Sequence, residues 1–195
     1  MSIIIGLTGP TGSGKSTASK QFEAFGFYVV DCDKLARVAV EKGTPGLRDL
    51  VSAFGDKILN SDKELNRKAL AEIAFKTKEN TELLNETLLP HIAKLVLAEC
   101  EKYDKVLLDA PTLFESGLNS VCSATVAVLA DTDIRLKRIT ERDGIDEAAA
   151  RLRISAGKSD DFYKQNADYY LFNNDEQEKL LGELESIIIE ITANK

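Results

Sequence analysis

Short apolar runs separated by amphipathic stretches dominate the pattern of the chain. Five runs rich in β-branched or aromatic residues suit buried strands, at 3–7, 27–30, 105–109, 124–129 and 169–172. Between them, apolar residues recur at helical spacing, at 15–25, 133–142, 147–157 and about 176–191. Strands that alternate with helices predict a parallel α/β sheet.

One long segment interrupts this alternation. From about Asp33 to Tyr103 the pattern is mostly helical and contains no clear strand. Helices are expected at 66–75 and at about 78–101, and Pro90 should kink or break the second helix. A helical segment of this length between two strands predicts an insertion into the sheet domain.

Composition narrows the class of protein. The 195 residues are 44% hydrophobic and 29% charged, close to the averages of soluble globular proteins, so disorder is excluded as the main state. A chain of this length buries a stable core without disulfides. Acidic residues (32) outnumber basic ones (25), and the net charge of −7 argues against a nucleic-acid-binding surface.

Cysteine, histidine and apolar patterns exclude further classes. The three cysteines are far apart and odd in number, which argues against a disulfide framework. The single histidine, His91, leaves a zinc site almost without ligands, and its apolar surroundings favour packing over catalysis. No apolar run is long enough to span a membrane, and no signal peptide is visible, so we expect a cytoplasmic protein.

A glycine-rich turn follows the first predicted strand. Residues 9–16 read Gly-Pro-Thr-Gly-Ser-Gly-Lys-Ser and fit G-x-x-x-x-G-K-[ST], the phosphate-binding P-loop. The glycines let successive N–H groups face one concavity, and the next helix adds its positive N-terminal end. Lys15 should reach the β- and γ-phosphates, and the Ser16 hydroxyl should ligate Mg²⁺. The strand before and the helix after favour nucleoside triphosphate binding over a chance match.

Carboxylates end two of the predicted strands, at the edge where open α/β sheets bind ligands. Asp31 and Asp33 would point the same way in an extended segment, and one could accept a proton from a substrate hydroxyl. Alternatively, both hold Mg²⁺-bound water, or Asp33 caps the following helix. Asp109 is placed like a Walker B carboxylate that meets Mg²⁺ through water, or it caps the turn before Pro111.

A basic segment lies between the last two predicted strands. It holds seven basic and four acidic residues between Arg135 and Lys158. Arg138 and Arg142 are four apart and therefore share one helical face. We interpret the segment as a lid that closes on the triphosphate, rather than as a solvated helix, because it lies within a phosphate-binding domain.

Missing motifs narrow the class of nucleotide-binding protein. A GTPase would need a guanine-reading N-K-x-D and a switch D-x-x-G, and the sequence contains neither. A motor ATPase normally needs a longer chain. A small chain with a P-loop, a helical insertion and a basic lid indicates a small-molecule or nucleotide kinase, in which closure excludes water from the transfer.

Several motifs in order resemble the dephospho-CoA kinase family over nearly the whole chain. The matching segments are 4–9, 30–37, 66–75, 109–117, 138–144 and 167–173. Residues 109–117, Asp-Ala-Pro-Thr-Leu-Phe-Glu-Ser-Gly, are the most specific block, because general nucleotide kinases lack it. The resemblance implies transfer of the ATP γ-phosphoryl group to the ribose 3′-hydroxyl of dephospho-CoA, which yields coenzyme A and ADP, with Mg²⁺ present.

The resemblance also implies roles for individual residues. Asp33 would act as general base on the 3′-hydroxyl. The resemblance places Arg142 against the phosphates from the lid, and the P-loop motif and the basic helical face add Lys15 and Arg138 as catalytic residues. ATP would be bound by Thr11, Gly12, Ser13, Gly14, Lys15, Ser16, Thr17 and Asn173. Dephospho-CoA would be bound by Asp33, Arg37, Arg67, Phe114 and Glu115, and the metal by Ser16 and, through water, Asp109.

The chain departs from the family pattern at a few positions. A His-Pro pair is usual where Leu89 precedes Pro90, a leucine is usual at Thr112, and glutamines are usual at Arg135 and Gly157. These changes bear on lid contacts and substrate affinity rather than on the reaction class.

We therefore predict a P-loop NTPase-type three-layer α/β domain over residues 1–195 with a five-stranded parallel sheet. A helical substrate-binding insertion is expected at about 60–104 and a lid at about 140–165. The expected partners are dephospho-CoA and ATP, and we expect a monomer that binds neither nucleic acid nor membrane. Two alternatives stay open: a kinase for another small molecule or nucleoside monophosphate, and a nucleotide-binding regulator without transferase activity.

Overall fold

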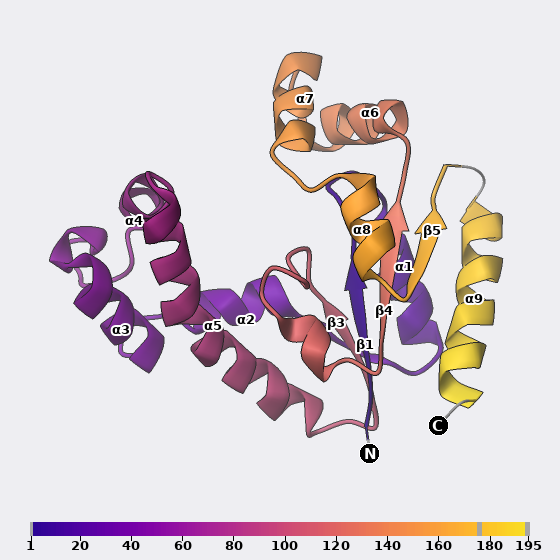
Figure 1. Cartoon of the computed structure of the whole chain (residues 1–195), viewed down its shortest axis with the longest axis horizontal. Coiled ribbons are helices and arrows are strands. Elements are labelled where there is room, and N and C mark those ends of the chain that lie inside the picture. Colours follow the sequence, from indigo (N-terminus) through magenta and orange to yellow (C-terminus); the bar gives the residue numbers. More distant parts are fainter. Residues whose placement is uncertain (1, 175–176, 194–195) are drawn as a thin grey trace. The chain divides into compact units, whose positions relative to one another are not determined.

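The computed structural model describes residues 2–174 and 177–193 (Figure 1). Its strands form a five-stranded sheet in the order β2-β3-β1-β4-β5, with parallel pairing of β1 with β3 and β4, and of β4 with β5. The strands are β1 (Ile3–Thr8), β2 (Tyr28–Asp31), β3 (Lys105–Asp109), β4 (Ala124–Leu129) and β5 (Tyr169–Phe172). Each lies within one residue of its predicted position, which confirms the α/β prediction.

The chain divides into two compact units. The first unit joins Met1–Val30 to Tyr103–Lys195 and contains the sheet and the P-loop. The second unit, Asp31–Lys102, is helical. The insertion predicted at about 60–104 covers the second half of this helical unit, which begins at Asp31.

Helices cover both faces of the sheet in the first unit. On one face lie α1 (Lys15–Ala24) and α9 (Gln177–Ala193). The core between them and the sheet is built from buried apolar residues such as Leu7, Phe22, Val128 and Leu184. On the opposite face, Ala127 and Leu129 pack against Tyr163 of α8 (Asp160–Asn166). This is the predicted three-layer arrangement.

Strand β4 is buried along its whole length, which explains why its sequence does not alternate between apolar and polar residues. It is fastened to β5 by a polar clamp. The Asp168 carboxylate accepts hydrogen bonds from the Thr125 N–H at 2.8 Å and from the Thr125 hydroxyl at 2.7 Å. The Asp168 N–H in turn donates to the Thr125 hydroxyl oxygen at 3.0 Å.

Three helices lie between β4 and β5. The first two, α6 (Thr132–Asp143) and α7 (Glu147–Ser155), confirm the predicted helices. They meet at Gly144, which has a φ of 63° and ends α6 in the left-handed conformation. Helix α8 was not predicted, because its seven residues are too short to show a period. It is fixed locally by Ser159, whose hydroxyl accepts from the Phe162 N–H at 3.2 Å.

The helical unit has its own core and its own caps. Its helices are α2 (Cys32–Val38), α3 (Pro45–Phe54), α4 (Arg67–Ala74) and α5 (Lys78–Cys100). The side chains of Thr44, Asn66 and Thr77 accept hydrogen bonds from N–H groups in the first turns of α3, α4 and α5. Buried residues that include Leu50, Ile58, Leu70, Ala74 and Leu84 form the core.

The sequence predicts a kink or a break at Pro90, and helix α5 is continuous from Lys78 to Cys100 with Pro90 inside it, so the helix does not break there. Proline removes one hydrogen-bond donor from a helix interior. In a helix of 23 residues this loss is local, since buried residues on both sides of the proline, Leu84 and Val96, hold the helix in place.

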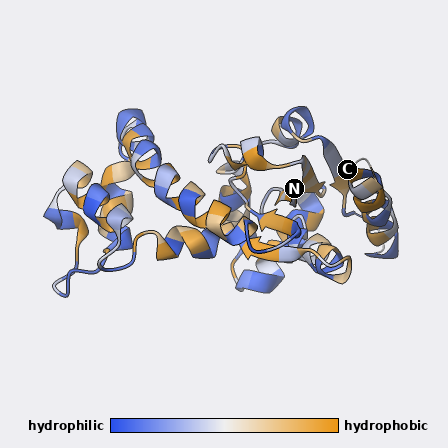
Figure 2. Cartoon of the chain, turned by 90° about the horizontal axis from the view of Figure 1, so that it is seen from below, coloured by the Kyte–Doolittle hydropathy of each residue, from blue (hydrophilic) through white to orange (hydrophobic). Residues whose placement is uncertain are grey.

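Hydropathy follows this architecture: the strands are mostly hydrophobic, and the helices mix hydrophobic with hydrophilic residues (Figure 2). Among the described residues, no helix combines the length and apolar character needed to cross a membrane. Two short 3₁₀ turns, Asp56–Ile58 and Leu118–Val121, complete the fold.

The clamp between β4 and β5 makes a stability prediction. Replacing Asp168 with alanine leaves the polar groups of Thr125, which is 4% exposed, without their acceptor. We expect the free energy of unfolding to fall by about 1–3 kcal/mol. The measurement is urea denaturation followed by circular dichroism, with Glu185→Ala on the exposed side of α9 as the control. Equal stability of the two variants would contradict a clamp.

Candidate active site

The P-loop connects β1 to α1 and surrounds an open cavity. Gly14 precedes α1 in a left-handed conformation, with φ 87° and ψ 26°. A Cβ atom there would also collide with the side-chain nitrogen of Asn173, so only glycine fits. The cavity has a volume of about 750 Å³ and is lined by residues 9–16, Asp109, Pro111, Arg138, Glu141 and Arg142.

The backbone of the P-loop is held from behind by side chains. The Ser13 carbonyl accepts hydrogen bonds from Asn173 Nδ2 at 2.8 Å and from Arg138 Nη1 at 3.2 Å. Arg138 also donates through Nη2 to the Asn173 carbonyl at 2.9 Å. Ser13 itself is 1% exposed, and its hydroxyl has no hydrogen-bond partner among the described residues. A buried hydroxyl without a hydrogen-bond partner in a phosphate-binding loop is expected at a position that contacts a ligand.

Lys15 and Asp109 meet inside this cavity. Lys15 is the first residue of α1, and Asp109 ends β3. Their side chains form an ion pair and are largely buried, with exposed fractions of 18% and 21%. Ser16 lines the same cavity, so a hydroxyl, a carboxylate and an ammonium group gather where the P-loop opens.

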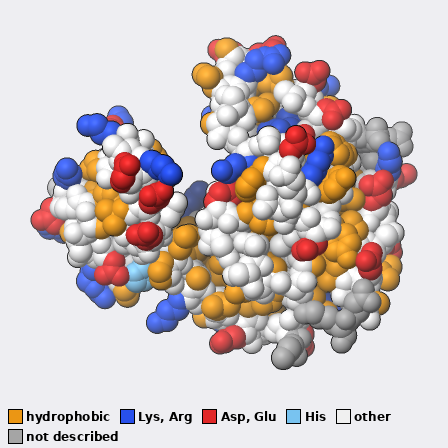
Figure 3. All heavy atoms as spheres, viewed as in Figure 1, with side chains coloured by type: hydrophobic (Ala, Val, Ile, Leu, Met, Phe, Trp, Pro, Cys, Tyr) orange, Lys and Arg blue, Asp and Glu red, His pale blue; other side chains and the backbone are white. Residues whose placement is uncertain are grey.

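Arg142 lies at the rim of the cavity and is mostly exposed. Its guanidinium donates to the neighbouring Asp143 at 2.7 and 2.9 Å. This hydrogen bond raises the pKa of Arg142 and lowers the pKa of Asp143. Arg153 also pairs with Asp143, and Arg151 with Glu147. Figure 3 shows both signs of charge over α6 and α7. Exposed pairs of this kind contribute little stability.

Arg135 contacts the P-loop but is not among the predicted site residues, although the sequence analysis places it in the basic segment and among the departures from the family pattern. It is only 4% exposed, and its Nε donates to the Thr11 carbonyl at 2.9 Å. Its Nη1 lies 3.5 Å from the Asp160 carboxylate, which begins α8. Burial lowers the pKa of Arg135, and the nearby Asp160 opposes this shift. The sequence signals were its place in the basic segment, one helical turn before Arg138, and its departure from the glutamine usual in the family; nothing in the pattern indicated burial.

Phe114 and Glu115 lie in the first unit, and neither lines the P-loop cavity. The Phe114 ring meets Phe162 of α8 edge-on, with centroids 5.9 Å apart. Glu115 is exposed. Burial raises the pKa of Tyr163 in this cluster to about 12, and Glu115 adds to the shift. Their predicted contact with dephospho-CoA stays a prediction.

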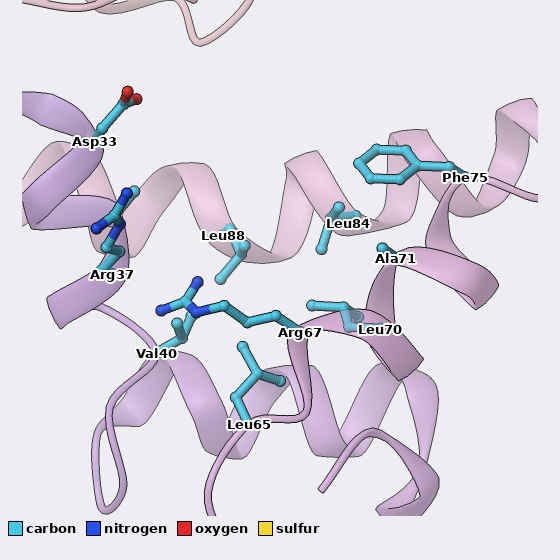
Figure 4. Close-up of a pocket in the computed structure, with 11 residues that line it drawn as sticks. Asp33, Arg37, Val40, Leu65, Arg67, Leu70, Ala71, Phe75, Leu84 and Leu88 are labelled. Carbon is cyan, nitrogen blue, oxygen red and sulfur yellow. The ribbon is translucent and has the colours of Figure 1, made fainter. Parts of the chain in front are cut away.

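A second cavity, of about 300 Å³, lies within the helical unit (Figure 4). Its charged residues are Asp33, Arg37 and Arg67. Its apolar residues are Ala36, Val40, Leu65, Leu70, Ala71, Phe75, Leu84 and Leu88. The structure therefore brings together three of the five residues predicted to bind dephospho-CoA.

The start of α2 corrects two expectations about the acidic pair. The chain becomes helical at Cys32, so Asp31 and Asp33 are not two positions of one strand. The cap of α2 is Asp31, whose carboxylate accepts from the Lys34 N–H at 2.9 Å, rather than Asp33. Asp33 lies in the first turn and lines the cavity of the helical unit.

A parallel sheet with a P-loop between β1 and α1, a carboxylate at the end of β3 and an arginine-bearing helix after β4 defines a P-loop kinase. The family model for dephospho-CoA kinase matches residues 3–179. The dephospho-CoA kinase of Listeria monocytogenes serotype 4b is 38% identical over 196 residues, covering 98% of each chain.

Solved structures agree with this class. A crystal structure from Thermus thermophilus has a TM-score of 0.81 at 29% identity and covers 97% of both chains. A dephospho-CoA kinase from Campylobacter jejuni has a TM-score of 0.57 at 23% identity, covers 96% of both chains and supports the fold alone. The chain belongs to the dephospho-CoA kinase family, whose members are kinases that use ATP as co-substrate.

The contact between Arg135 and the P-loop makes a testable prediction. Arg135→Met removes the buried charge and the hydrogen-bond donor that hold the Thr11 carbonyl and face Asp160, and it keeps a side chain of similar length. We expect the KM for ATP to rise about tenfold, because a hydrogen bond from a charged group positions the loop. Steady-state kinetics with varied ATP measures this change.

The control for this prediction is Arg151→Met, which removes an exposed arginine that pairs with Glu147 on α7. It should leave the KM for ATP within twofold of the parent value, since exposed pairs contribute little. Equal effects of the two substitutions would argue against a positioning role for Arg135.

Proposed function

We propose that this chain transfers the γ-phosphoryl group of ATP to the ribose 3′-hydroxyl of dephospho-CoA, giving coenzyme A and ADP. The observation that carries the proposal is the P-loop cavity, in which Lys15, Ser16 and Asp109 meet, in a chain of this family. The phosphates of ATP are bound by the N–H groups of residues 11–17 and by Lys15.

Mg²⁺ fits the donors of this cavity. Among the described residues no group of three or more histidine, cysteine, aspartate or glutamate side chains could hold a metal alone. Ser16 and Asp109 instead offer one hydroxyl and one carboxylate, and Mg²⁺ commonly takes one or two protein oxygens together with phosphates and water. Ser16 and Asp109 would hold the ion, with water between it and Asp109, and the ion would neutralise phosphate charge.

Arg138 and Arg142, two of the three arginines of α6, have different roles. Arg138 is occupied by carbonyl groups of the P-loop and of Asn173, which supports a positioning role. Arg142 lies at the cavity rim, where its guanidinium can exchange Asp143 for the transferred phosphoryl group. The segment at about 140–165 acts as the lid, and its exposed ion pairs are weak enough to break on closure.

Asn173 also acts on the P-loop rather than only on ATP. It is 7% exposed, and its amide group holds the Ser13 carbonyl. Its position directly after β5 supports a place for the adenine of ATP beside this loop.

The helical unit takes the acceptor. Arg37 and Arg67 supply positive charge for the 5′-diphosphate of dephospho-CoA, and Asp33 accepts or orients the proton of the 3′-hydroxyl. Because the transition state of phosphoryl transfer is loose, positioning and charge contribute more than the strength of the base. Closure of the lid excludes water and so prevents hydrolysis of ATP.

The proposal is tested by the release of ADP from ATP and Mg²⁺ with and without dephospho-CoA. We expect release that depends on dephospho-CoA and a product heavier by one phosphoryl group in mass spectrometry. ATP binding without a phosphorylated product would favour a regulator. Turnover with a different hydroxyl substrate or with a nucleoside monophosphate, but not with dephospho-CoA, would show that the protein is a kinase for another acceptor.

Asp33 can be tested separately from the fold of α2. Asp33→Asn should lower kcat about 10²-fold and leave the Kd for ATP unchanged, because it removes the proton acceptor alone. Asp31→Asn is a matched control two residues away, since asparagine also caps helices and the cap should persist. An Asp33→Asn enzyme with the parent kcat would exclude Asp33 as the base.

A further inference from the structure

The cavity of the helical unit is divided into a charged end and an apolar end. Asp33 and Arg37 lie one helical turn apart on α2, and Arg67 is the first residue of α4. In Figure 4 the Arg67 side chain extends toward Arg37, so the two guanidinium groups lie at the same end as Asp33. Among the described residues neither arginine has a carboxylate partner, so this end offers two positive charges to an anion.

The other end of the cavity is apolar. Leu70 of α4 and Leu84 of α5 are core residues that reach the cavity wall. Phe75 directly follows α4 and lies beside Ala71 and Leu84 in Figure 4. Phe75 is 68% exposed, which is a high value for a phenylalanine and is not required by packing of the core. An exposed ring at the edge of an apolar wall is suited to cover a ligand.

The span between the two ends is long. Phe75 comes eight positions after Arg67, directly after the last residue of α4. At 1.5 Å per residue this separation is about 12 Å. Along the cavity, Asp33 comes first, the two arginines follow, and the apolar wall lies beyond them.

We propose that the apolar end, formed by Leu70, Phe75 and Leu84, binds the pantetheine arm of dephospho-CoA. This assignment rests on the proposed function, in which Asp33 meets the 3′-hydroxyl. In dephospho-CoA the diphosphate joins the ribose to the pantetheine arm, so a ribose at Asp33 and a diphosphate at the arginines direct the arm toward Phe75. Adenine is bonded to the same ribose, so it stays near Asp33 and does not reach the far end of α4.

The shape of the apolar end agrees with this assignment. The pantetheine arm is a flexible chain with a dimethyl-substituted carbon, and it can lie along an extended apolar surface. A cavity of about 300 Å³ is too small to enclose the whole of dephospho-CoA, so part of the ligand lies outside it. Phe75 then contributes contact area that ordinary adenine nucleotides, which lack the arm, cannot use.

The test compares the two halves of dephospho-CoA as ligands. AMP carries the adenine and ribose, and 4′-phosphopantetheine carries the arm. Inhibition by each half is measured against dephospho-CoA at saturating ATP, and binding of 4′-phosphopantetheine is measured by calorimetry without turnover. We expect Phe75→Ala to weaken the binding of 4′-phosphopantetheine about tenfold and to raise the KM for dephospho-CoA by a similar factor. The Ki of AMP and kcat should stay within twofold.

Two further variants serve as controls. Phe75→Leu keeps an apolar side chain and should restore most of the affinity. Leu83 precedes Leu84 on α5, is 37% exposed and does not line the cavity. Leu83→Ala should therefore leave the affinity for 4′-phosphopantetheine unchanged.

Other results would overturn the assignment. Weaker binding of AMP with unchanged binding of 4′-phosphopantetheine would place the adenine at Phe75 instead. Unchanged binding of both halves, or no binding of 4′-phosphopantetheine to the parent protein, would remove the arm from this cavity. A different result, the absence of coenzyme A formation by the parent protein, would contradict the proposed function. Calorimetry measures the binding of 4′-phosphopantetheine without turnover, so it distinguishes the two failures.

Discussion

The structure of the site depends on how the P-loop backbone is held. A loop that turns its N–H groups toward a phosphate must turn some of its carbonyl groups away, and these carbonyls need donors. Arg135 supplies a donor to Thr11, and Arg138 and Asn173 supply donors to Ser13. Helix α6 and the end of β5 therefore fix the conformation of a loop that lies more than a hundred residues earlier in the sequence.

This arrangement separates the arginines that hold the loop from the arginine at the rim of the cavity. The guanidinium groups of Arg135 and Arg138 face the loop, whereas Arg142 faces the rim of the cavity. Beyond Arg142, α6 and α7 pack against each other through an apolar cluster that includes Ile139 and Ala150, and exposed ion pairs lie outside it. The two helices can therefore move as one body if they form the proposed lid, while the loop stays fixed.

The helical unit follows a different principle. Local caps begin its helices, and an apolar core of its own joins them. Its cavity uses the edge of that core as an apolar wall and places charge at the opposite end. A substrate with a charged centre and a long neutral arm is recognised along such a gradient, since each part meets a surface of matching polarity.

The sequence by itself determined the strands, the P-loop and the class of kinase, because these depend on local apolar runs and on residues spaced within one turn. It also indicated Asp33, Arg37 and Arg67, which the fold gathers in one cavity. Only the tertiary structure decided that Asp31 rather than Asp33 caps α2, that α5 continues through Pro90, and that Arg135 is buried under the P-loop. The burial of Arg135 depends on a partner that is distant in the sequence, and such a pairing leaves no periodic trace in the chain. The cap of α2 is local, but two aspartates suit it equally by sequence, and the point at which β2 ends decides between them.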